Sequence, residues 1–259
     1  MRDEMTAILA IYKWPSQAFW RYFEFKVLKE IHYERPILEI GCGDGQLSSL
    51  IFDKIDEGID VNPRSIDRCR RLSGHVYVEM RCQDARDLQP INGGYGTVFA
   101  NCVVEHVPDI ERVLDGCFRG LRLGGSLVIT VPLKEMNSHL LFPWDWYARL
   151  RQRQLVHVNL FTRSKWLELL ERVGFSQIEF RPYLSARECK LWDALDSPGC
   201  IGSGRYCVAT AVCFLGARLM PKSARRWLLR HTAEWLSVKA SRDCEKGPAC
   251  ASVIVARKN

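Results

Sequence analysis

The sequence lacks the patterns that mark several common classes of protein. Its eleven cysteines include no C-x-x-C pair and no Cys/His cluster with zinc spacing, so no structural zinc site is expected. Residues 1–4 lead into aromatic and charged sequence instead of the apolar core of a signal peptide, which favours reduced, mostly buried thiols in a cytoplasmic protein. An apolar run at residues 207–217 is too short to span a bilayer.

The net charge of +7 is unevenly distributed along the 259 residues. Residues 1–184 hold 24 basic and 24 acidic side chains, whereas residues 185–259 hold 13 basic and 6 acidic ones, which accounts for the whole excess. A basic region beside a neutral one suggests an anionic partner: a phosphate-bearing substrate, a membrane surface or nucleic acid. The length and the apolar content of 47% fit one large domain, or one domain with an elaboration.

A glycine-rich turn after an apolar run carries most of the information. Residues 37–45 read Ile-Leu-Glu-Ile-Gly-Cys-Gly-Asp-Gly, and a helical pattern follows from Gln46. Glycine supplies positive φ and lets the backbone approach a ligand, so this pattern predicts a nucleotide-type pocket. The dinucleotide motif would need glycine at position 46. Glycine at 45, with Glu39 before the turn, favours a ligand with an amino acid end, S-adenosylmethionine. Asp60 stands about 20 residues on, where a ribose-binding carboxylate is expected.

Strand and helix patterns alternate over residues 36–131. Strands are predicted near 36–40, 57–61, 76–80, 97–102 and 126–131, and helices are predicted to start near Asp44, Pro63 and Pro108. Later strands are predicted at 176–181 and 251–257, and Thr162 and Gly174 are the natural ends of a helix between them. Alternating βα units imply a parallel sheet covered on both faces, with its ligand at the carboxyl ends of the strands.

In this order, the segments resemble the class I (Rossmann-like) S-adenosylmethionine-dependent methyltransferases over roughly residues 36–182. The segments that carry the resemblance are 37–45, Gln83–Leu88, Tyr95–Val107 and Leu121–Pro132. The chain also resembles bacterial methyltransferases that accompany glycan and natural-product pathways. The resemblance implies a three-layer α/β sandwich with a mostly parallel seven-stranded sheet, an antiparallel last strand and a helical insertion before that strand.

The resemblance also implies a binding site for S-adenosylmethionine, with S-adenosylhomocysteine as the product and no metal. Glu39 would take the amino end of the donor, directly or through the turn, and Asp60 would accept from both ribose hydroxyls. Asp84 would receive the adenine amino group, unless Asp87 does so in a shifted register. Glu39 and Asp60 could instead be ordinary strand-end carboxylates. The expected cofactor-binding residues are Glu39, Gly41, Cys42, Gly43, Gly45, Asp60, Val61, Asp84, Ala85, Asn101 and Cys102.

Three residues are candidates for catalysis. Methyl transfer from a sulfonium needs the donor and acceptor held in line and, for a hydroxyl acceptor, a group that manages a proton. Glu105 and His106 follow the fourth strand, where the acceptor should lie, and His157 follows an aromatic segment. Either imidazole titrates near neutrality and could take the proton, and either could instead be structural.

The predicted organisation places a methyltransferase core between two elaborations. Residues 1–35 would contribute a helix, predicted over 14–31, that covers the cofactor side or packs on the sheet. The core would span 36–182, with an aromatic and arginine-rich segment at 137–157 that is either a lid over the acceptor or a packing loop. Residues 183–249 would form a basic helical insertion with an amphipathic helix over 221–238, and residues 250–259 the closing strand.

The resulting expectation is an enzyme that methylates an oxygen of a small-molecule, glycan, lipid-linked or natural-product acceptor. We expect a soluble protein that associates peripherally with a membrane. One alternative is a nucleic-acid methyltransferase, which the basic region 185–259 permits. However, no RNA-binding module is recognisable, and Asn101–His106 lacks the Asn/Asp-Pro-Pro-aromatic motif of many base methyltransferases. Another alternative is a non-catalytic protein that binds S-adenosylmethionine.

Overall fold

The computed structural model describes residues 2–12, 14–89, 91–197, 221–240 and 248–259. Its helices are α1 (Arg2–Tyr12), α2 (Pro15–Leu28), α3 (Pro63–Ser73), α4 (Ile110–Gly120), α5 (Asp145–Leu155), α6 (Arg163–Val173), α7 (Ala186–Asp196) and α9 (Lys222–Ala240). Short 3-10 helices are η1 (Ser48–Leu50), η2 (Ala85–Asp87) and η3 (Lys134–His139). The strands are β1 (Ile37–Ile40), β2 (Ile55–Asp60), β3 (Tyr77–Cys82), β4 (Tyr95–Asn101), β5 (Leu121–Pro132), β6 (Ser176–Ser185) and β7 (Ala249–Arg257).

The seven strands form one sheet in the order β3-β2-β1-β4-β5-β7-β6. The pairs from β3 to β5 are parallel, whereas β7 runs antiparallel to both of its neighbours. For example, Val255 of β7 lies opposite Val128 of β5 and Glu179 of β6. The predicted fold class, a mostly parallel seven-stranded sheet with an antiparallel last strand, is therefore confirmed.

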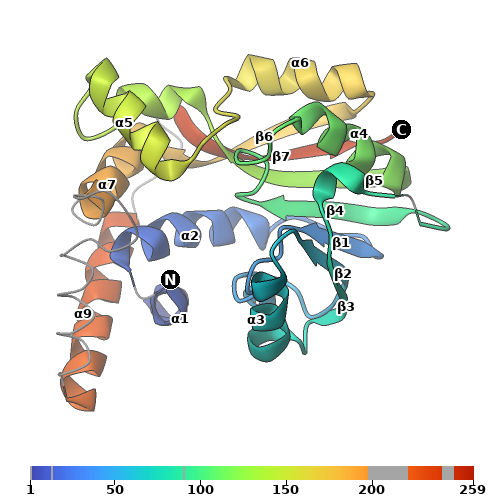
Figure 1. The fold of residues 1–259 in the computed structure, drawn as a ribbon. Helices are drawn as coiled ribbons and strands as arrows, with labels where there is room; N and C mark the ends of the chain where they lie inside the picture. The colour runs from blue at the N-terminus through green and yellow to red at the C-terminus, as the bar shows by residue number, and fades with distance from the viewer. Residues whose placement is uncertain (1, 13, 90, 198–220, 241–247) are drawn as a thin grey trace.

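Helices cover both faces of the sheet, as the near-continuous apolar strands predict. In β1, Ile37 belongs to the hydrophobic core that also contains residues of α2 and α7, whereas Leu38 and Ile40 belong to the core formed with α4 and α6. Figure 1 shows α4 and α6 above the sheet and α2 beneath it. Because β1 and β4 are central, their carboxyl ends meet between these layers.

The prediction of a helix starting near Asp44 is wrong. The chain instead makes turns and the single short helix η1 before β2. The Ser49 hydroxyl donates to the Gln46 carbonyl at 2.7 Å, and the Ser48 hydroxyl donates to Glu39 at 2.6 Å. The Ser49 bond is local, whereas the Ser48 bond ties the segment to β1, and together they hold the chain in turns.

The predicted insertion at 183–249 begins inside the sheet, because β6 continues to Ser185 and buries Tyr183 and Leu184. Helix α7 follows directly, and α9 covers the helix predicted over 221–238 except for its first residue, Pro221. The apolar run at 207–217 lies outside the described residues. Within the described ranges, every helix is too short or too polar to cross a membrane.

A buried ion pair fixes α5 to α7. The Arg151 side chain is only 1% exposed, and its guanidinium donates to Asp193 and Asp196 at 2.6 Å each. The hydroxyl of Tyr147 also donates to Asp193, at 2.8 Å. Because Asp193 is fully buried, its charge depends on these donors.

Replacing Arg151 with leucine is expected to lower the free energy of unfolding by about 3–5 kcal/mol, because it leaves the buried carboxylate of Asp193 without its cation. Urea denaturation measures the change. Arg153→Leu, two residues along the same helix at an exposed position, is the matched control and should change stability by no more than about 0.5 kcal/mol. Equal, small effects in both variants would contradict the structural role of the pair.

Candidate active site

The turn after β1 has the backbone that its glycines predict. Gly41, Gly43 and Gly45 have φ angles of 67°, 58° and 69°. A Cβ atom at Gly45 would lie 2.8 Å from the Cys69 sulfur and 2.8 Å from the Tyr77 ring. The turn is therefore packed tightly against α3 and β3, and its position is fixed before any ligand binds.

Asp60, at the end of β2, lies beside this turn as its spacing predicts. Its carboxylate accepts hydrogen bonds from the backbone N–H groups of Gly43 at 3.0 Å and Asn62 at 2.8 Å. Cys42 is buried, and its N–H donates to a β2 carbonyl at 3.0 Å. Val61, which is 67% exposed, leaves an apolar surface next to the carboxylate.

Glu39 lies under the turn and is almost completely buried. Its two carboxylate oxygens accept from the Ser48 hydroxyl and the Tyr77 hydroxyl, each at 2.6 Å. Burial raises the pKa of Glu39 to about 7, although both hydrogen bonds oppose the shift. Of the two routes left open by the sequence, this position favours a contact with the donor through the turn.

The segment after β3 holds both acidic residues considered for adenine. The Arg86 side chain donates to Asp84 at 2.7 Å, and this bond lowers the pKa of the carboxyl. Asp87 accepts from Arg112 at 2.6 Å, and Ala85 between them is buried. Both carboxylates are paired with an arginine, so the structure leaves the choice between them open.

At the end of β4, Asn101 and Cys102 are held by the neighbouring strand. The hydroxyl of Thr130 in β5 donates to the Asn101 amide oxygen at 2.6 Å and accepts from the Cys102 N–H at 2.8 Å. Cys102 has a φ of 50°, an unusual conformation for a residue with a side chain. These bonds turn the chain sharply at the edge where the donor is expected.

Glu24, which is fully buried in α2, is not among the residues predicted from the sequence. It accepts hydrogen bonds from Trp20 at 2.7 Å, Arg21 at 2.6 Å, Tyr183 at 3.1 Å and the Cys102 thiol at 2.7 Å. Helix α2 therefore packs on the sheet and also contacts the end of β4. The sequence did contain one indication of this buried residue, because Glu24 is a carboxylate on the apolar face of the predicted helix.

The three candidate catalytic residues meet in space. Ligand-type atoms of Glu105, His106 and His157 lie within 4.8 Å of one another. Asn159 holds the two segments together, because its side-chain amide donates to the carbonyls of Val104 and Val107 at 2.7 and 2.6 Å. Within the described residues this is the one cluster with a metal-ligand composition, and two imidazoles with a carboxylate would suit a transition metal.

Burial sets the protonation of this cluster. Glu105 is 2% exposed, one of its oxygens has no hydrogen-bond partner, and burial raises its pKa to about 8. Burial and the charges of His106 and Arg151 lower the pKa of His157 to about 4. Near neutral pH, Glu105 therefore retains its proton and His157 is uncharged.

Gln152 orients His157. Its side-chain oxygen lies 2.6 Å from His157 Nδ1, and its side-chain nitrogen donates to Asn137 at 2.7 Å. The oxygen of Gln152 can only accept, so the proton of the neutral imidazole is assigned to Nδ1. The lone pair on Nε2 is then available to accept a proton.

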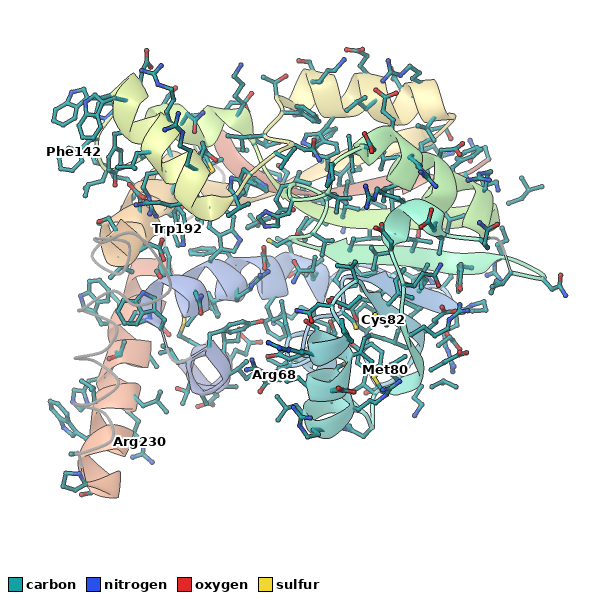
Figure 2. The ribbon with its side chains drawn as sticks, in the orientation of Figure 1. Arg68, Met80, Cys82, Phe142, Trp192 and Arg230 are labelled. Carbon is teal, nitrogen blue, oxygen red and sulfur yellow. The ribbon has the colours of Figure 1, made fainter. Side chains whose placement is uncertain are left out.

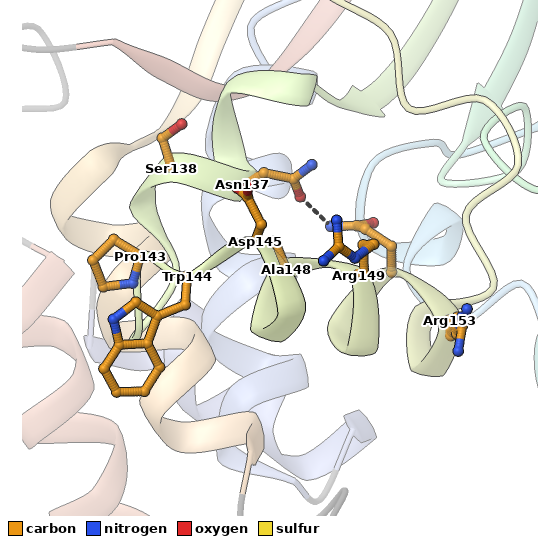
Figure 3. A pocket seen from close by; sticks show the side chains of 9 residues that line it. Asn137, Ser138, Pro143, Trp144, Asp145, Ala148, Arg149 and Arg153 are labelled. Atoms are coloured by element: carbon orange, nitrogen blue, oxygen red, sulfur yellow. Dashed lines mark hydrogen bonds between the residues drawn. The ribbon is translucent and has the colours of Figure 1, made fainter.

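A cavity of about 450 Å³ lies against the outer side of α5 (Figure 3). Gln152 lines it and links it to His157, whereas the glycine turn after β1 is not part of its wall. The lining residues are Asn137, Ser138, Pro143, Trp144, Asp145, Ala148, Arg149, Gln152 and Arg153.

A family model described as a methyltransferase domain matches residues 20–179, which are 160 of the 259 residues. The chain belongs to this methyltransferase family. The resemblance to class I S-adenosylmethionine-dependent methyltransferases is thereby confirmed.

Two curated relatives are O-methyltransferases by name. The ubiquinone biosynthesis O-methyltransferase of Xanthomonas oryzae pv. oryzae is 31% identical over 150 residues, covering 55% of this chain and 63% of the relative. The malonyl-[acyl-carrier protein] O-methyltransferase of a Paenibacillus species is 24% identical over 156 residues, covering 56% of each. The chain thus spans less than two thirds of the length of either relative. Neither name refers to a glycan, so these relatives do not support the glycan part of the resemblance.

Solved methyltransferases share the fold at low sequence identity. One from Thermotoga maritima has a TM-score of 0.56 at 16% identity and covers 92% of this chain and 89% of its own. Phosphoethanolamine N-methyltransferase 2 of Haemonchus contortus, solved with S-adenosyl-L-methionine, has a TM-score of 0.56 at 16% identity and covers 100% of this chain and 57% of its own. At this identity the likeness concerns the fold alone.

Replacing Asp60 with alanine is expected to weaken binding of S-adenosylmethionine at least about tenfold, because a charged acceptor for two hydroxyls is lost. Isothermal titration calorimetry measures the change. Asp67→Ala, an exposed carboxylate on α3, serves as the control and should bind like the wild type. An unchanged affinity in the Asp60 variant would rule out its ribose role.

Replacing Glu105 with glutamine is expected to stabilise the protein increasingly as the pH rises. Burial disfavours the charged form of Glu105 and raises its pKa from 4.5 to about 8. The wild type therefore loses stability as the pH rises between these two values, whereas glutamine stays uncharged and the variant does not. The difference in melting temperature between variant and wild type should therefore grow across this range and then level off. Glu171→Gln at an exposed position should show no such trend, and a flat difference for Glu105→Gln would contradict the burial effect.

Proposed function

We propose that this protein transfers the methyl group of S-adenosylmethionine to a hydroxyl oxygen of a small-molecule, glycan or natural-product intermediate. The observation that carries the proposal is the neutral His157 held beside Glu105 and His106, directly after the strand end at Cys102 that is expected to face the donor. The proposed proton acceptor and the segment expected to line the S-adenosylmethionine site then lie at the same edge of the sheet.

In this proposal the residues act mainly by position. The acceptor oxygen attacks the methyl carbon, the carbon–sulfur bond breaks, and its electron pair stays on sulfur to give S-adenosylhomocysteine. The hydroxyl proton passes to Nε2 of His157, while the Nδ1–H group continues to donate its hydrogen bond to the side-chain oxygen of Gln152. Holding the groups in line provides most of the rate enhancement, and the base adds about 100-fold or more.

The named relatives support oxygen as the acceptor atom, since both are O-methyltransferases. The fold alone does not choose the atom, because an N-methyltransferase shares it. The protonated Glu105 adds a second argument from the site. It brings no negative charge that would hold a cationic amine beside His157.

The deciding experiment has two steps. Calorimetry with S-adenosylmethionine and S-adenosylhomocysteine tests the cofactor, and no binding of either at micromolar concentration would end the proposal. A panel of phenolic, glycan, lipid-linked and peptide hydroxyl acceptors is then assayed for S-adenosylhomocysteine formation. Tight binding without turnover on any acceptor would favour a non-catalytic binding protein.

Replacing His157 with glutamine is expected to lower kcat about 100-fold or more while leaving donor affinity within about twofold, because proton transfer is lost but the donor site is intact. Steady-state kinetics and calorimetry measure the two effects. His75→Gln, an exposed histidine between α3 and β3, is the control. For the wild type, the acidic limb of kcat/KM assigned to this histidine should lie near pH 4 and not near its ordinary 6.5. A limb at the ordinary value with unchanged kcat in the variant would remove His157 from this role.

A further inference from the structure

Helix α5 buries an arginine and exposes two large apolar side chains. Its buried residues are Tyr147, Ala148 and the ion-paired Arg151. On the opposite side, Trp146 is 56% exposed and Leu150 is 44% exposed. A helix that only packed on the core would bury its tryptophan and leucine, so the outer face is suited to an apolar partner.

The loop before α5 extends this apolar face into a stack of aromatic rings. The rings of Phe142 and Trp144 stack 5.0 Å apart at 7°, and those of Trp144 and Trp146 stack 5.7 Å apart at 23°. Phe142 and Trp144 are 41% and 51% exposed. Large rigid rings with one polar edge favour the boundary between water and lipid.

Cations flank the rings. Arg149 and Arg153 are exposed, lie one helical turn apart, and have no ion pair among the residues that the structure describes. The one carboxylate that shares their cavity is Asp145, which leaves a net positive charge there. Unpaired arginines beside exposed tryptophans match a surface of anionic lipid headgroups.

Helix α9 also exposes two tryptophans. Trp227 and Trp235 are 60% and 45% exposed, and Arg230 between them is also exposed. Figure 2 shows Phe142 and Arg230 along the same edge of the molecule, and Figure 1 places α5 and α9 on that edge with α7 between them. The tryptophan-bearing surface is therefore continued by a second helix, on which the exposed Glu234 lies one turn from Arg230.

We propose that the outer face of α5, formed by Phe142, Trp144, Trp146, Arg149 and Arg153, docks on an anionic phospholipid bilayer. The same helix carries Gln152, the hydrogen-bond partner of His157. Docking through α5 would therefore hold a membrane-borne acceptor near the candidate base. Only this last consequence rests on the proposed methyl transfer; the docking itself does not.

Vesicle flotation of the full chain, without donor or acceptor, tests the docking separately from catalysis. Phosphatidylcholine vesicles with and without phosphatidylglycerol are compared at low salt and at about 1 M salt, where the Debye length is about 3 Å. We expect at least about tenfold stronger partitioning onto the anionic vesicles at low salt, and loss of this preference at high salt.

Two double variants separate the apolar and charged contributions. Trp144→Ser with Trp146→Ser should abolish flotation on both kinds of vesicle. Arg149→Gln with Arg153→Gln should lower the anionic partitioning about tenfold. Arg64→Gln with Arg71→Gln, which removes two exposed arginines from α3, is the matched control and should behave as the wild type. Circular dichroism and an unchanged affinity for S-adenosylmethionine confirm that each variant is folded.

Three results would overturn the proposal. The first is absent or equal flotation of the wild type on neutral and anionic vesicles at low salt. The second is wild-type flotation of both double variants at α5. The third is a dimer, detected by light scattering, that the tryptophan substitutions convert to a monomer, since the face would then be an interface between two copies.

Discussion

One buried carboxylate connects three parts of the molecule that the site requires. Glu24 of α2 receives hydrogen bonds from Arg21 in its own helix, from Cys102 after β4 and from Tyr183 in β6. A charge without exposure is costly unless such donors stay in place, so the helix, the strand end and the edge of the sheet are positioned together. Glu105 and His106 of the candidate catalytic cluster follow β4 directly, a few residues after Cys102.

The parts of the fold that could be predicted are those whose causes are local. Gly41, Gly43 and Gly45 are read from the sequence because positive φ is a property of single residues. That the predicted helix near Asp44 would be replaced by turns and η1 could not be predicted from the sequence. The hydrogen bond from the Ser48 hydroxyl to Glu39 forms only when β1 has its place in the sheet. Likewise, the partners of Glu24 lie 78 and 159 residues away, and helical periodicity does not reveal them.

In the candidate site, too, single residues could be predicted from the sequence but their contacts could not. Glu105, His106 and His157 could each be named from their place after a strand or an aromatic segment, but their meeting depends on Asn159. The Asn159 amide donates hydrogen bonds to two carbonyls of the loop after β4, and no sequence motif indicates such a contact. The protonation of the cluster is also a tertiary effect, because burial is the main cause of the shifts of Glu105 and His157.

The position of β7 determines when the sheet can close. This strand comes after the other six in the chain, yet it lies between β5 and β6 and pairs with both. Until residues 249–257 have left the ribosome, β5 and β6 each present an unpaired edge, and Ile129 and Phe180 lack Ile254, the residue that lies between them in the sheet. The other part of the sheet, β3 to β5, contains no such late strand. Nascent chains of this protein therefore pass through a stage in which β3 to β5 have all their partners except β7, while β5 and β6 still have open strand edges that can pair with other chains.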